Sequence, residues 1–567
     1  MNHLFKIAAL LLVLVLLFSA CRTDPGASTT AAPETTLPAT ADRSDPAPTE
    51  PEPQSSTQSA PETESTEAPP EEPLNLGGYA VSSSTKEATA AGMEILAKGG
   101  NAVDAAVAVA FALGVTEPYS SGLGGSGVMV VYDPATDQGY SLDYYACAGK
   151  AEENTDDVGV PGFLAGMQKA LDRFGTLPMS EVIKPAIRLA EEGFPVTALF
   201  ARRLTYSAKL RDNPAFAGIG EGDTVIQQEL ADTLKLIRDQ GTDVFYRGEI
   251  ARDIAKNCDL TVNDLKKYRA YSRSALRSRF NGMRIYTTTA PTSGVVTSEM
   301  LTVADLLDVP DPREDPQGYL EVMKLANDIG FNTRRTKLVD PKFYDFDGLT
   351  LVSRKYVKKL IDKAQKENEA LRFEPDPEKR CTTQFAVIDS SGMLVSVTNT
   401  LSDNWGSYIY VDGFYLNNSL SNFNETGKNA YEPGKRPRTH FSPVIALGDR
   451  ENDHFCLAIG SPGGDAIPKV VSQVLIDVLK FDVDLQTAVD AGRYYYDDDG
   501  LLCLEVAGDT EAEARIDLGR ISQRYYFSSS HVMFGCTAIV GYDPEQGIVA
   551  VSDLRRDGSD SQIAHTP

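Results

Sequence analysis

The chain has 567 residues, of which 42% are apolar, and its 80 acidic and 54 basic side chains give a formal net charge of −26. A sizeable core is therefore available, whereas a nucleic-acid partner is not expected, because such a partner requires a basic face. The five histidines lie far apart, and no HExxH or paired CxxC motif occurs. We therefore expect no metal site and no cofactor.

The N-terminus predicts export from the cytoplasm. Residues 7–18 are an unbroken apolar run behind Lys6, which is too short to span the ~30 Å hydrocarbon core of a bilayer and is typical of a signal peptide. The residues after Phe18 are Ser-Ala-Cys21, which resemble a bacterial lipobox. Residues 1–20 would then be a signal peptide, and Cys21 would be lipidated. Because Phe18 is unusual at its position, an ordinary signal peptide cut nearby is the alternative.

A change of composition follows. Residues 22–73 contain eleven prolines and eleven acids but no aromatic residue, so they bury too little apolar surface to fold. We predict a disordered stalk over 21–73. Leader and stalk contribute −8, so residues 74–567 carry −18. These features predict a bacterial cell-surface protein that a lipidated Cys21 anchors to the membrane.

The other cysteines do not predict a disulfide framework. Their positions are 147, 258, 381, 456, 503 and 536, and this spacing is irregular. Disulfides are permitted outside the cytoplasm. For most of these cysteines we expect the role of small buried apolar residues.

The body is expected to open with a strand at 79–82 and two helices, of which the second spans 102–113 and is capped by Asn101. The glycine run 122–127 and a strand at 128–132 follow. This run matches GxGxxG, but a dinucleotide site needs strand, glycines and helix in that order. Here a helix precedes the glycines, so we interpret the run as a tight turn at which backbones pass closely.

Residues 161–366 are expected to be mainly helical, for example at 163–173, 179–192 and 230–240. After Arg380 the pattern changes to strands, which are expected at 384–388, 394–398, 407–411, 455–459, 538–540 and 548–551, with helices at 470–479 and 485–491. Blocks of helices and antiparallel strands indicate a layered α+β body.

One predicted hairpin brings two threonines face to face. Its loop is Ser390-Ser391-Gly392, and glycine at the last loop position suits a three-residue hairpin. Centring the turn on Ser391 pairs Thr382 with Thr400, so their hydroxyls come within hydrogen-bonding reach. By itself a threonine pair is ordinary, because β-branched residues favour strands.

A series of motifs along the chain indicates a function for this threonine pair. The motifs are 98–106 (KGGNAVDAA), 117–125 (EPYSSGLGG), 158–162 (VGVPG), 186–193 (AIRLAEEG), 382–383 (TT), 434–437 (GKRP), 460–464 (GSPGG) and 553–558 (DLRRDG). Together they resemble the γ-glutamyltransferase (γ-glutamyltranspeptidase) family of N-terminal nucleophile hydrolases over essentially all of 77–567. The resemblance implies a four-layer αββα sandwich.

The resemblance also implies a mechanism that needs no histidine. The precursor would cleave itself between Cys381 and Thr382 into a large subunit, 74–381 of the body, and a small subunit, 382–567, which stay associated. The freed α-amine of Thr382, with an ordinary pKa of ~7.7–8.0, would act as general base toward its own hydroxyl. Thr382 would attack an amide carbonyl, and water or an amine would then take the acyl group.

Further catalytic roles follow from matching residue by residue. Thr400 matches the family threonine that bonds the nucleophile. Gly463 and Gly464 match the pair whose backbone N–H groups form the oxyanion hole, where glycine permits close approach. The neighbouring Thr383 leaves the cleavage position ambiguous by one residue, although the hairpin register favours Thr382.

The substrate-binding positions depart from the family pattern. Tyr145 stands where the family has the arginine that binds the substrate α-carboxylate, and Ser419 and Asn422 stand where acceptors hold the α-amino group. Ser402 replaces an asparagine, and Thr439-His440 replaces a serine pair. We keep all six as candidate substrate-binding residues. His440 either lines the pocket or packs.

These departures predict a substrate other than glutathione. Loss of one partner of a buried charge pair typically costs ~2–5 kcal/mol, so a free γ-glutamyl group should bind poorly. The candidates are a small-molecule, peptide or polymer amide, including a poly-γ-glutamate capsule and the side chain that a cephalosporin-type acylase removes. The alternative of another class is a surface binding lipoprotein without catalysis, which would remain one uncut chain.

Overall fold

The computed structural model describes residues 74–151, 154–367, 381–448, 454–496, 501–505, 525–528 and 534–566. These residues belong to the second of two compact units, which spans residues 71–567. The predicted leader, Cys21 and the stalk lie outside the described residues. None of the helices described has both the length and the apolar character that a membrane span requires.

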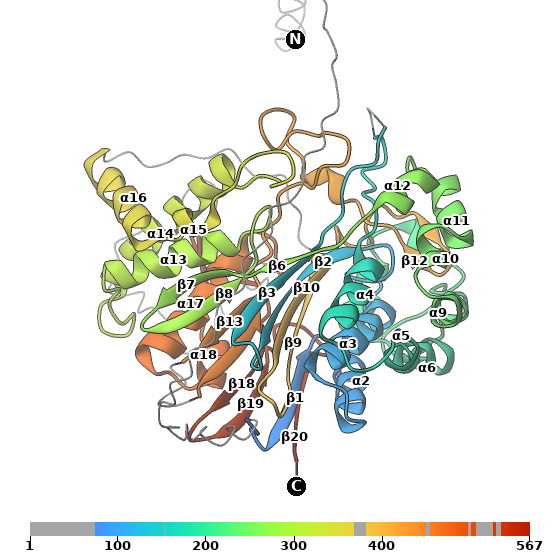
Figure 1. Cartoon of the computed structure of the whole chain (residues 1–567), viewed down its shortest axis with the longest axis horizontal. Coiled ribbons are helices and arrows are strands. Elements are labelled where there is room, and N and C mark those ends of the chain that lie inside the picture. Colours follow the sequence, from blue (N-terminus) through green and yellow to red (C-terminus); the bar gives the residue numbers. More distant parts are fainter. Residues whose placement is uncertain are drawn as a thin grey trace, which may run out of the picture. The chain divides into compact units, whose positions relative to one another are not determined.

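Two antiparallel sheets form the middle of this unit (Figure 1). The first has the order β20 (Asp560–His565), β1 (Gly78–Ser83), β9 (Cys381–Ile388), β10 (Leu394–Ser402), β2 (Ser126–Asp133), β3 (Gln138–Tyr144) and β6 (Tyr271–Ser274). The second has the order β19 (Gly547–Ser552), β18 (Ala538–Asp543), β14 (Cys456–Gly460), β13 (Val444–Leu447), β8 (Met283–Thr287) and β7 (Leu276–Phe280). Short strands pair in three smaller sheets, namely β4 (Phe194–Pro195) with β5 (Thr224–Val225), β11 (Tyr410–Val411) with β12 (Phe414–Tyr415), and β15 (Tyr494–Tyr496) with β16 (Leu502–Glu505) and β17 (Tyr525–Ser528).

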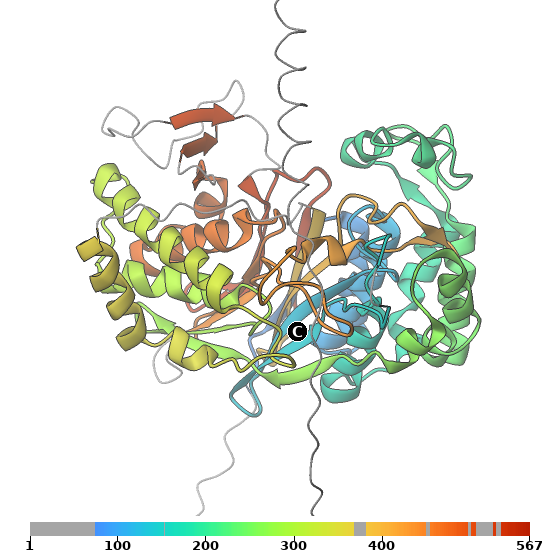
Figure 2. The same ribbon diagram turned by 90° about the horizontal axis from the view of Figure 1, so that it is seen from above.

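Helices cover the outer face of each sheet, as the view from above shows (Figure 2). The helices on the side of the first sheet are α2 (Lys86–Ala97), α3 (Ala102–Thr116), α4 (Phe163–Phe174), α5 (Met179–Val182), α6 (Lys184–Glu192), α7 (Ala198–Leu204), α8 (Ala208–Arg211), α9 (Gln228–Gln240), α10 (Asp243–Tyr246), α11 (Glu249–Asn257) and α12 (Val262–Lys267). Those on the side of the second are α13 (Gly294–Leu306), α14 (Pro316–Lys337), α15 (Gly348–Leu351), α16 (Arg354–Glu367), α17 (Ala466–Phe481) and α18 (Leu485–Asp490). The predicted αββα sandwich is thereby confirmed.

Strand β9 divides its side chains between two cores. Phe385 and Val387 pack beneath the helices of the first layer, whereas Ala386 and Ile388 join the core between the two sheets. Because successive side chains of a strand point to opposite faces, Thr382 lies on the face toward the second sheet. The nucleophile predicted from the sequence therefore faces the interior of the sandwich.

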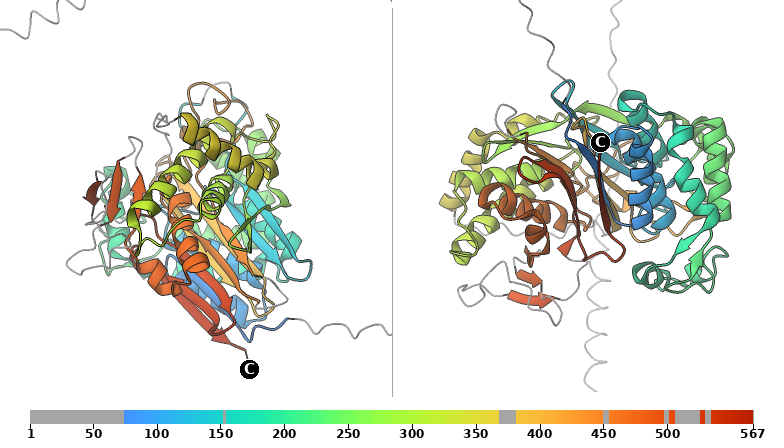
Figure 3. Two further views of the ribbon diagram at one scale, coloured as in Figure 1. Left: turned by 90° about the vertical axis from the view of Figure 1, so that its left-hand side faces the viewer. Right: turned by 90° about the horizontal axis from the view of Figure 1, so that it is seen from below.

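The predicted hairpin register is confirmed. The Cα partner of Thr382 is Thr400, and Gly392 in the loop has a φ of 82° in the left-handed region. Strands β9 and β10 lie between β1 and β2, so residues on both sides of the Cys381–Thr382 bond share one sheet. At the edge of the same sheet, β20 from the end of the chain (red) pairs with β1 from its beginning (blue), as Figure 3 shows. Cleavage at that bond would leave two chains joined by strand pairing.

Other predictions need correction. The mainly helical prediction for 161–366 is wrong at β6, β7 and β8, where the alternating buried and exposed residues of β7 mark a strand. The single helix predicted at 179–192 is two helices, and Pro185 lies in the first turn of the second. The strand predicted at 407–411 is reduced to Tyr410–Val411, because Tyr408 has a φ of 60°, which interrupts extended backbone.

The glycine run between α3 and β2 is a close backbone crossing, as predicted. A Cβ atom on Gly124 would lie 2.1 Å from the carbonyl oxygen of Tyr415, and one on Gly125 would lie 2.5 Å from that of Thr400. Neither distance is possible without movement of the backbone. The run thus holds the 415–417 segment against the end of β10, next to Thr400.

We predict that Gly124→Ala lowers the free energy of unfolding by about 3 kcal/mol, because backbone rather than a flexible side chain must move. The matched control is Gly220→Ala, where the nearest atom to the new Cβ would be 3.6 Å away. The control should lie within about 0.5 kcal/mol of the wild type. Chemical denaturation of both variants tests this, and equal stabilities would contradict the crossing.

Candidate active site

The bond before Thr382 is held by a directed hydrogen bond. The hydroxyl of Thr400 donates to the carbonyl oxygen of Cys381, and the backbone N–H of Ser402 donates to that same hydroxyl at 2.8 Å. Since the Ser402 N–H occupies a lone pair of the Thr400 oxygen, the hydroxyl proton points to the carbonyl. This contact polarises the carbonyl carbon that Thr382 would attack, and Thr382 itself is 4% exposed.

The neighbouring threonine has a different environment. The hydroxyl of Thr383 donates to Ser84 Oγ at 2.9 Å, on the face of the sheet that carries the first helix layer. Thr383 is fully buried there. Of the two threonines, Thr382 therefore has the orientation that a nucleophile between the sheets requires.

An ion pair that sequence reasoning missed holds the start of β9. The guanidinium of Arg556 donates to the carbonyl oxygen of Thr382 at 2.9 Å and binds both carboxylate oxygens of Glu117 at 2.7 and 2.8 Å. Burial alone would lower the pKa of Arg556, but Glu117 raises it above its ordinary value. Both residues lie in motifs noted above, 117–125 and 553–558, and their place in these motifs is the sequence signal that could have identified the pair. The pair connects the predicted large and small subunits at the cleavage position.

Cys381 is fixed by its own side chain. Its Sγ lies 3.1 Å from the carbonyl oxygen of Tyr119, to which it donates, and 3.2 Å from Ser120 Oγ. Burial raises the pKa of the Cys381 thiol, which keeps it protonated and unreactive. The thiol therefore positions the residue before the predicted cleavage position and does not compete with the hydroxyl of Thr382. All six cysteines in the described part of the chain are free.

The glycine pair predicted to form an oxyanion hole follows β14. The strand end is tied to the nucleophile's hairpin, because Ser396 Oγ donates to the carbonyl oxygen of Ile459 at 2.9 Å and a Cβ on Gly460 would lie 2.3 Å from Gln384. Gly463 and Gly464 then enter α17 with φ values of 127° and 61°. Those values favour glycine, and a Cβ on Gly463 would lie 3.2 Å from the Cα atom of Gly535.

Four of the candidate substrate-binding residues form two hydrogen-bonded pairs. Ser402 and Ser419 join their hydroxyls at 2.8 Å, and the amide nitrogen of Asn422 donates to the hydroxyl of Tyr145 at 2.8 Å. All four are buried. The arrangement brings the 402, 419–422 and 145 segments together, and none of these four side chains is charged.

The remaining two candidates, Thr439 and His440, are held against the second helix layer. The backbone N–H of Thr439 donates to the carbonyl oxygen of Pro291. The ring of His440 lies 5.9 Å from that of Phe331, and its Nδ1 is 3.4 Å from a guanidinium nitrogen of Arg334. Burial, and next the charge of Arg334, lower the pKa of His440 well below its ordinary value. The low pKa favours the neutral imidazole, and the buried ring packs against Phe331. Its lining of the substrate pocket stays a prediction.

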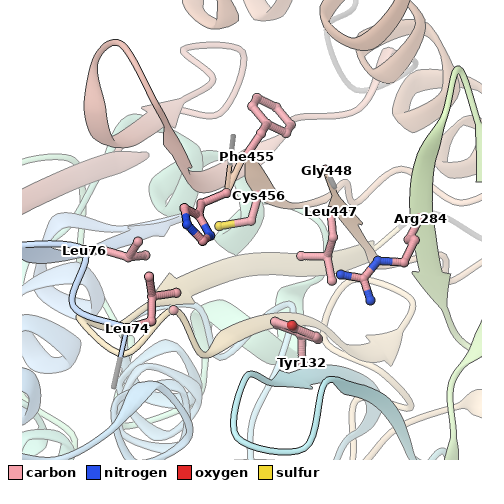
Figure 4. A pocket seen from close by; sticks show the side chains of 10 residues that line it. Leu74, Leu76, Tyr132, Arg284, Leu447, Gly448, Phe455 and Cys456 are labelled. Atoms are coloured by element: carbon pink, nitrogen blue, oxygen red, sulfur yellow. The ribbon is translucent and has the colours of Figure 1, made fainter. Parts of the chain in front are cut away.

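A separate cavity lies at the opposite end of the hairpin (Figure 4). Its volume is about 30 Å³, and it is lined by Leu74, Leu76, Arg284 and the loop residue Gly392, among others. Gly392 is at the turn of β9 and β10, whereas Thr382 and Thr400 are at their other ends. This cavity is therefore distinct from the candidate site. Among the described residues no cluster of His, Cys, Asp and Glu could hold a metal ion.

Comparisons with known proteins show which family the chain resembles. The profile of the family described as Gamma-glutamyltranspeptidase matches residues 88–563. A protein named Capsule biosynthesis protein CapD proenzyme, from Bacillus anthracis, is 35% identical over 492 residues, 85% of this chain and 90% of that protein. A Glutathione hydrolase proenzyme from Bacillus subtilis is 31% identical, and the match covers 82% of this chain and 88% of that protein. The solved structure of a cephalosporin acylase from Bacillus halodurans superimposes with a TM-score of 0.71 at 26% identity, over 89% of this chain and 98% of that one.

We predict that the purified wild-type chain separates on a denaturing gel into a small chain of 186 residues and a larger one. Thr382→Ala should remain uncut, and Thr400→Ala should be cut about 100-fold more slowly, because a donor to the developing oxyanion is lost. Thr400→Ser and Thr383→Ala, which keep the Thr400 donor and the nucleophile, are the controls. A cut Thr382→Ala chain would disprove the assignment.

The state of His440 predicts a pH dependence of stability. Its pKa is lowered in the folded chain, so an unfolded chain with an ordinary value of ~6.5 binds more protons and stability falls as pH drops below about 6.5. Replacing His440 by Gln should make the free energy of unfolding depend less on pH between pH 7 and 5. The control is His565→Gln at an exposed position, and chemical denaturation at each pH is the measurement. Parallel curves for the wild type and H440Q would contradict a buried neutral ring.

Proposed function

Because the chain belongs to the γ-glutamyltranspeptidase family, we propose that it is a self-processing amide hydrolase or acyltransferase whose nucleophile is Thr382. The observation that carries this proposal is the hydrogen bond from Thr400 to the carbonyl oxygen of Cys381, directly across the hairpin from Thr382. It supports a precursor poised for cleavage at that carbonyl. No charged or metal-bound group is needed for the step.

The proposed chemistry uses the same threonine twice. First the Thr382 hydroxyl attacks the Cys381 carbonyl and passes its proton to the peptide nitrogen, so the Cys381 C–N bond breaks, an ester forms and the Thr382 α-amine is freed. Water then hydrolyses that ester, which releases the Cys381 carboxylate and restores the Thr382 hydroxyl. That amine then accepts the hydroxyl proton when Thr382 attacks an amide substrate, and it returns the proton to the leaving amine. Gly463 and Gly464 would stabilise the oxyanion, and water or a second amine would release the acyl group.

The acyl pocket is proposed to be neutral. Tyr145 and Asn422 occupy positions where the family resemblance implies an arginine for the substrate carboxylate and an acceptor for its amine, and here they bond to each other at 2.8 Å. A free γ-glutamyl group would thus meet no opposite charge from this pair. An internal residue of a γ-linked chain has no free α-amine, because that nitrogen is acylated. Such an interior unit of an amide polymer suits Asn422, and the relative named for capsule biosynthesis supports this class of substrate.

A second candidate is removal of an N-acyl side chain from a small molecule. The solved structure of a cephalosporin acylase favours this candidate, because 98% of that chain matches this one. A substrate of that kind would also lack the zwitterion that Tyr145 and Asn422 cannot bind. Polymer and small-molecule amides are separated by direct assay, and a chain that has lost catalysis would stay uncut.

The proposed location is the cell surface, with Cys21 as a lipid anchor and 22–73 as the stalk. The described chain begins at the hairpin end of the sandwich, where the N–H of Leu76 donates to the carbonyl oxygen of Ser390 at 2.8 Å. Thr382 lies at the other end of that hairpin. The predicted stalk would thus join the folded part at the end of the hairpin that does not carry Thr382.

We predict that the processed enzyme hydrolyses poly-γ-glutamate faster than glutathione. The double variant Tyr145→Arg/Asn422→Asp, which restores two opposite charges, should raise kcat/KM for glutathione at least about tenfold, since hydrogen bonds to charged groups contribute ~1.5–3 kcal/mol. The control Tyr145→Phe removes the Tyr–Asn bond without adding charge and should not gain this activity. Rapid turnover of glutathione by the wild type would refute the neutral pocket.

A further inference from the structure

An open cavity of about 250 Å³ lies beside the proposed acyl pocket and is lined by five cationic side chains. They come from four separate segments: Lys150, Lys267 with Arg269, Lys342, and Arg436. The first four are exposed at the cavity mouth, whereas Arg436 is 3% exposed. A body with a net charge of −18 thus gathers basic residues from distant parts of its sequence around one hollow.

The positive charge of this cavity is not neutralised by the described part of the chain. Arg436 is paired with Asp143 at 3.4 Å, but the four exposed cations form no ion pair with any described residue. The one carboxylate in the lining, Asp264, accepts hydrogen bonds from the backbone of Lys150 and from Thr261. A concave wall of one sign of charge concentrates oppositely charged ligands.

The cavity and the acyl pocket meet at Tyr145. The carbonyl oxygen of Tyr145 accepts from Arg436 Nε at 3.0 Å and from the hydroxyl of Tyr268 at 2.9 Å, and both donors line the cavity. The hydroxyl of the same tyrosine accepts from Asn422 in the acyl pocket. One residue therefore contacts both sites, its backbone on one side and its side chain on the other.

The strand register gives the span between the nucleophile and this cavity. Thr382 lies opposite Thr400, which in turn lies opposite Ser126. The next residue, Gly127, lies opposite Tyr144 at the end of β3. Adjacent strands are ~4.8 Å apart, so three steps cover ~14 Å. An α-linked chain advances ~3.3–3.6 Å per residue, and a γ-linked unit, with five backbone atoms instead of three, advances about 6 Å in proportion, so about two or three γ-linked units reach from one to the other.

We propose that this cavity is a binding site for the carboxylates of an extended anionic chain, several residues away from the amide bond that Thr382 attacks. The inference rests on the proposed function for the direction in which that chain runs. The site selects for length as well as charge: a single γ-glutamyl amide ends before the cavity, whereas an acidic polymer spans the acyl pocket and the lysines.

Binding to the uncut full-length Thr382→Ala chain tests the site without relying on catalysis. The probe is fluorescently labelled poly-γ-glutamate of about fifty residues, followed by anisotropy at low salt, and the test variant adds Lys150→Gln, Lys267→Gln and Lys342→Gln. The matched control adds Lys355→Gln, Lys358→Gln and Lys359→Gln on α16, three exposed lysines with the same total charge. We expect Kd to rise about tenfold in the test variant, since each exposed ion pair contributes modestly and three are removed, and to stay within about twofold in the control.

Two further arms separate the possible failures. Affinity of the parent for the polymer should fall as salt shortens the screening length from about 30 Å at 0.01 M to about 10 Å at 0.1 M, and a neutral polyglutamine should not bind. Equal Kd values for test and control variants, or equal binding of the neutral chain, would overturn the site. If the cut wild-type enzyme binds the polymer through these lysines but does not cleave it, the site stands and the proposed function fails. If it cleaves the polymer, kcat/KM for the polymer relative to that for a single γ-glutamyl amide should fall about tenfold in a cut enzyme with the three lysine substitutions.

Discussion

In the proposed mechanism, the chemistry depends on the hydrogen bond from the Thr400 hydroxyl to the Cys381 carbonyl oxygen. It forms because β9 and β10 pair in a register that places Thr382 opposite Thr400. The strand pairing is irregular at Ser402, whose φ is 77°, and the backbone N–H of Ser402 donates to the Thr400 hydroxyl. The same pairing places Thr382 on the face between the sheets. A shift of register by one residue would turn that hydroxyl toward the helices, where Thr383 lies bonded to Ser84.

The surroundings of this contact divide into fixed and altered parts. The part that matches the family consists of two contacts. The Arg556–Glu117 ion pair binds the carbonyl oxygen of Thr382, and the close backbone crossing at Gly124 and Gly125 packs the 415–417 segment against the end of β10. The altered part is the acyl pocket, where Tyr145 and Asn422 satisfy each other as a neutral pair. We propose that this combination keeps the reaction of the family and changes the acyl group. The proposed role of the cationic cavity next to Tyr145 extends that change from a single acyl residue to an acidic chain.

Local patterns predicted the centre of the molecule well. The position of Gly392 in its loop is sufficient to set the hairpin register, and through it the pairing of Thr382 with Thr400. Contacts between distant segments could not be predicted in the same way. Glu117 and Arg556 are 439 residues apart in sequence, and nothing local says that they meet at Thr382. The strands at 271–287 were missed because they are short and rich in arginine and serine, so their alternation was read as part of a helical region.

The identity of the N-terminal residue of the small chain tests the central claim most directly. If Thr382 is the nucleophile and frees its own amine, Edman sequencing of the smaller chain from purified wild-type protein should begin Thr-Thr-Gln-Phe. A sequence that begins at Thr383 or elsewhere, or a purified protein that stays one chain, would contradict it.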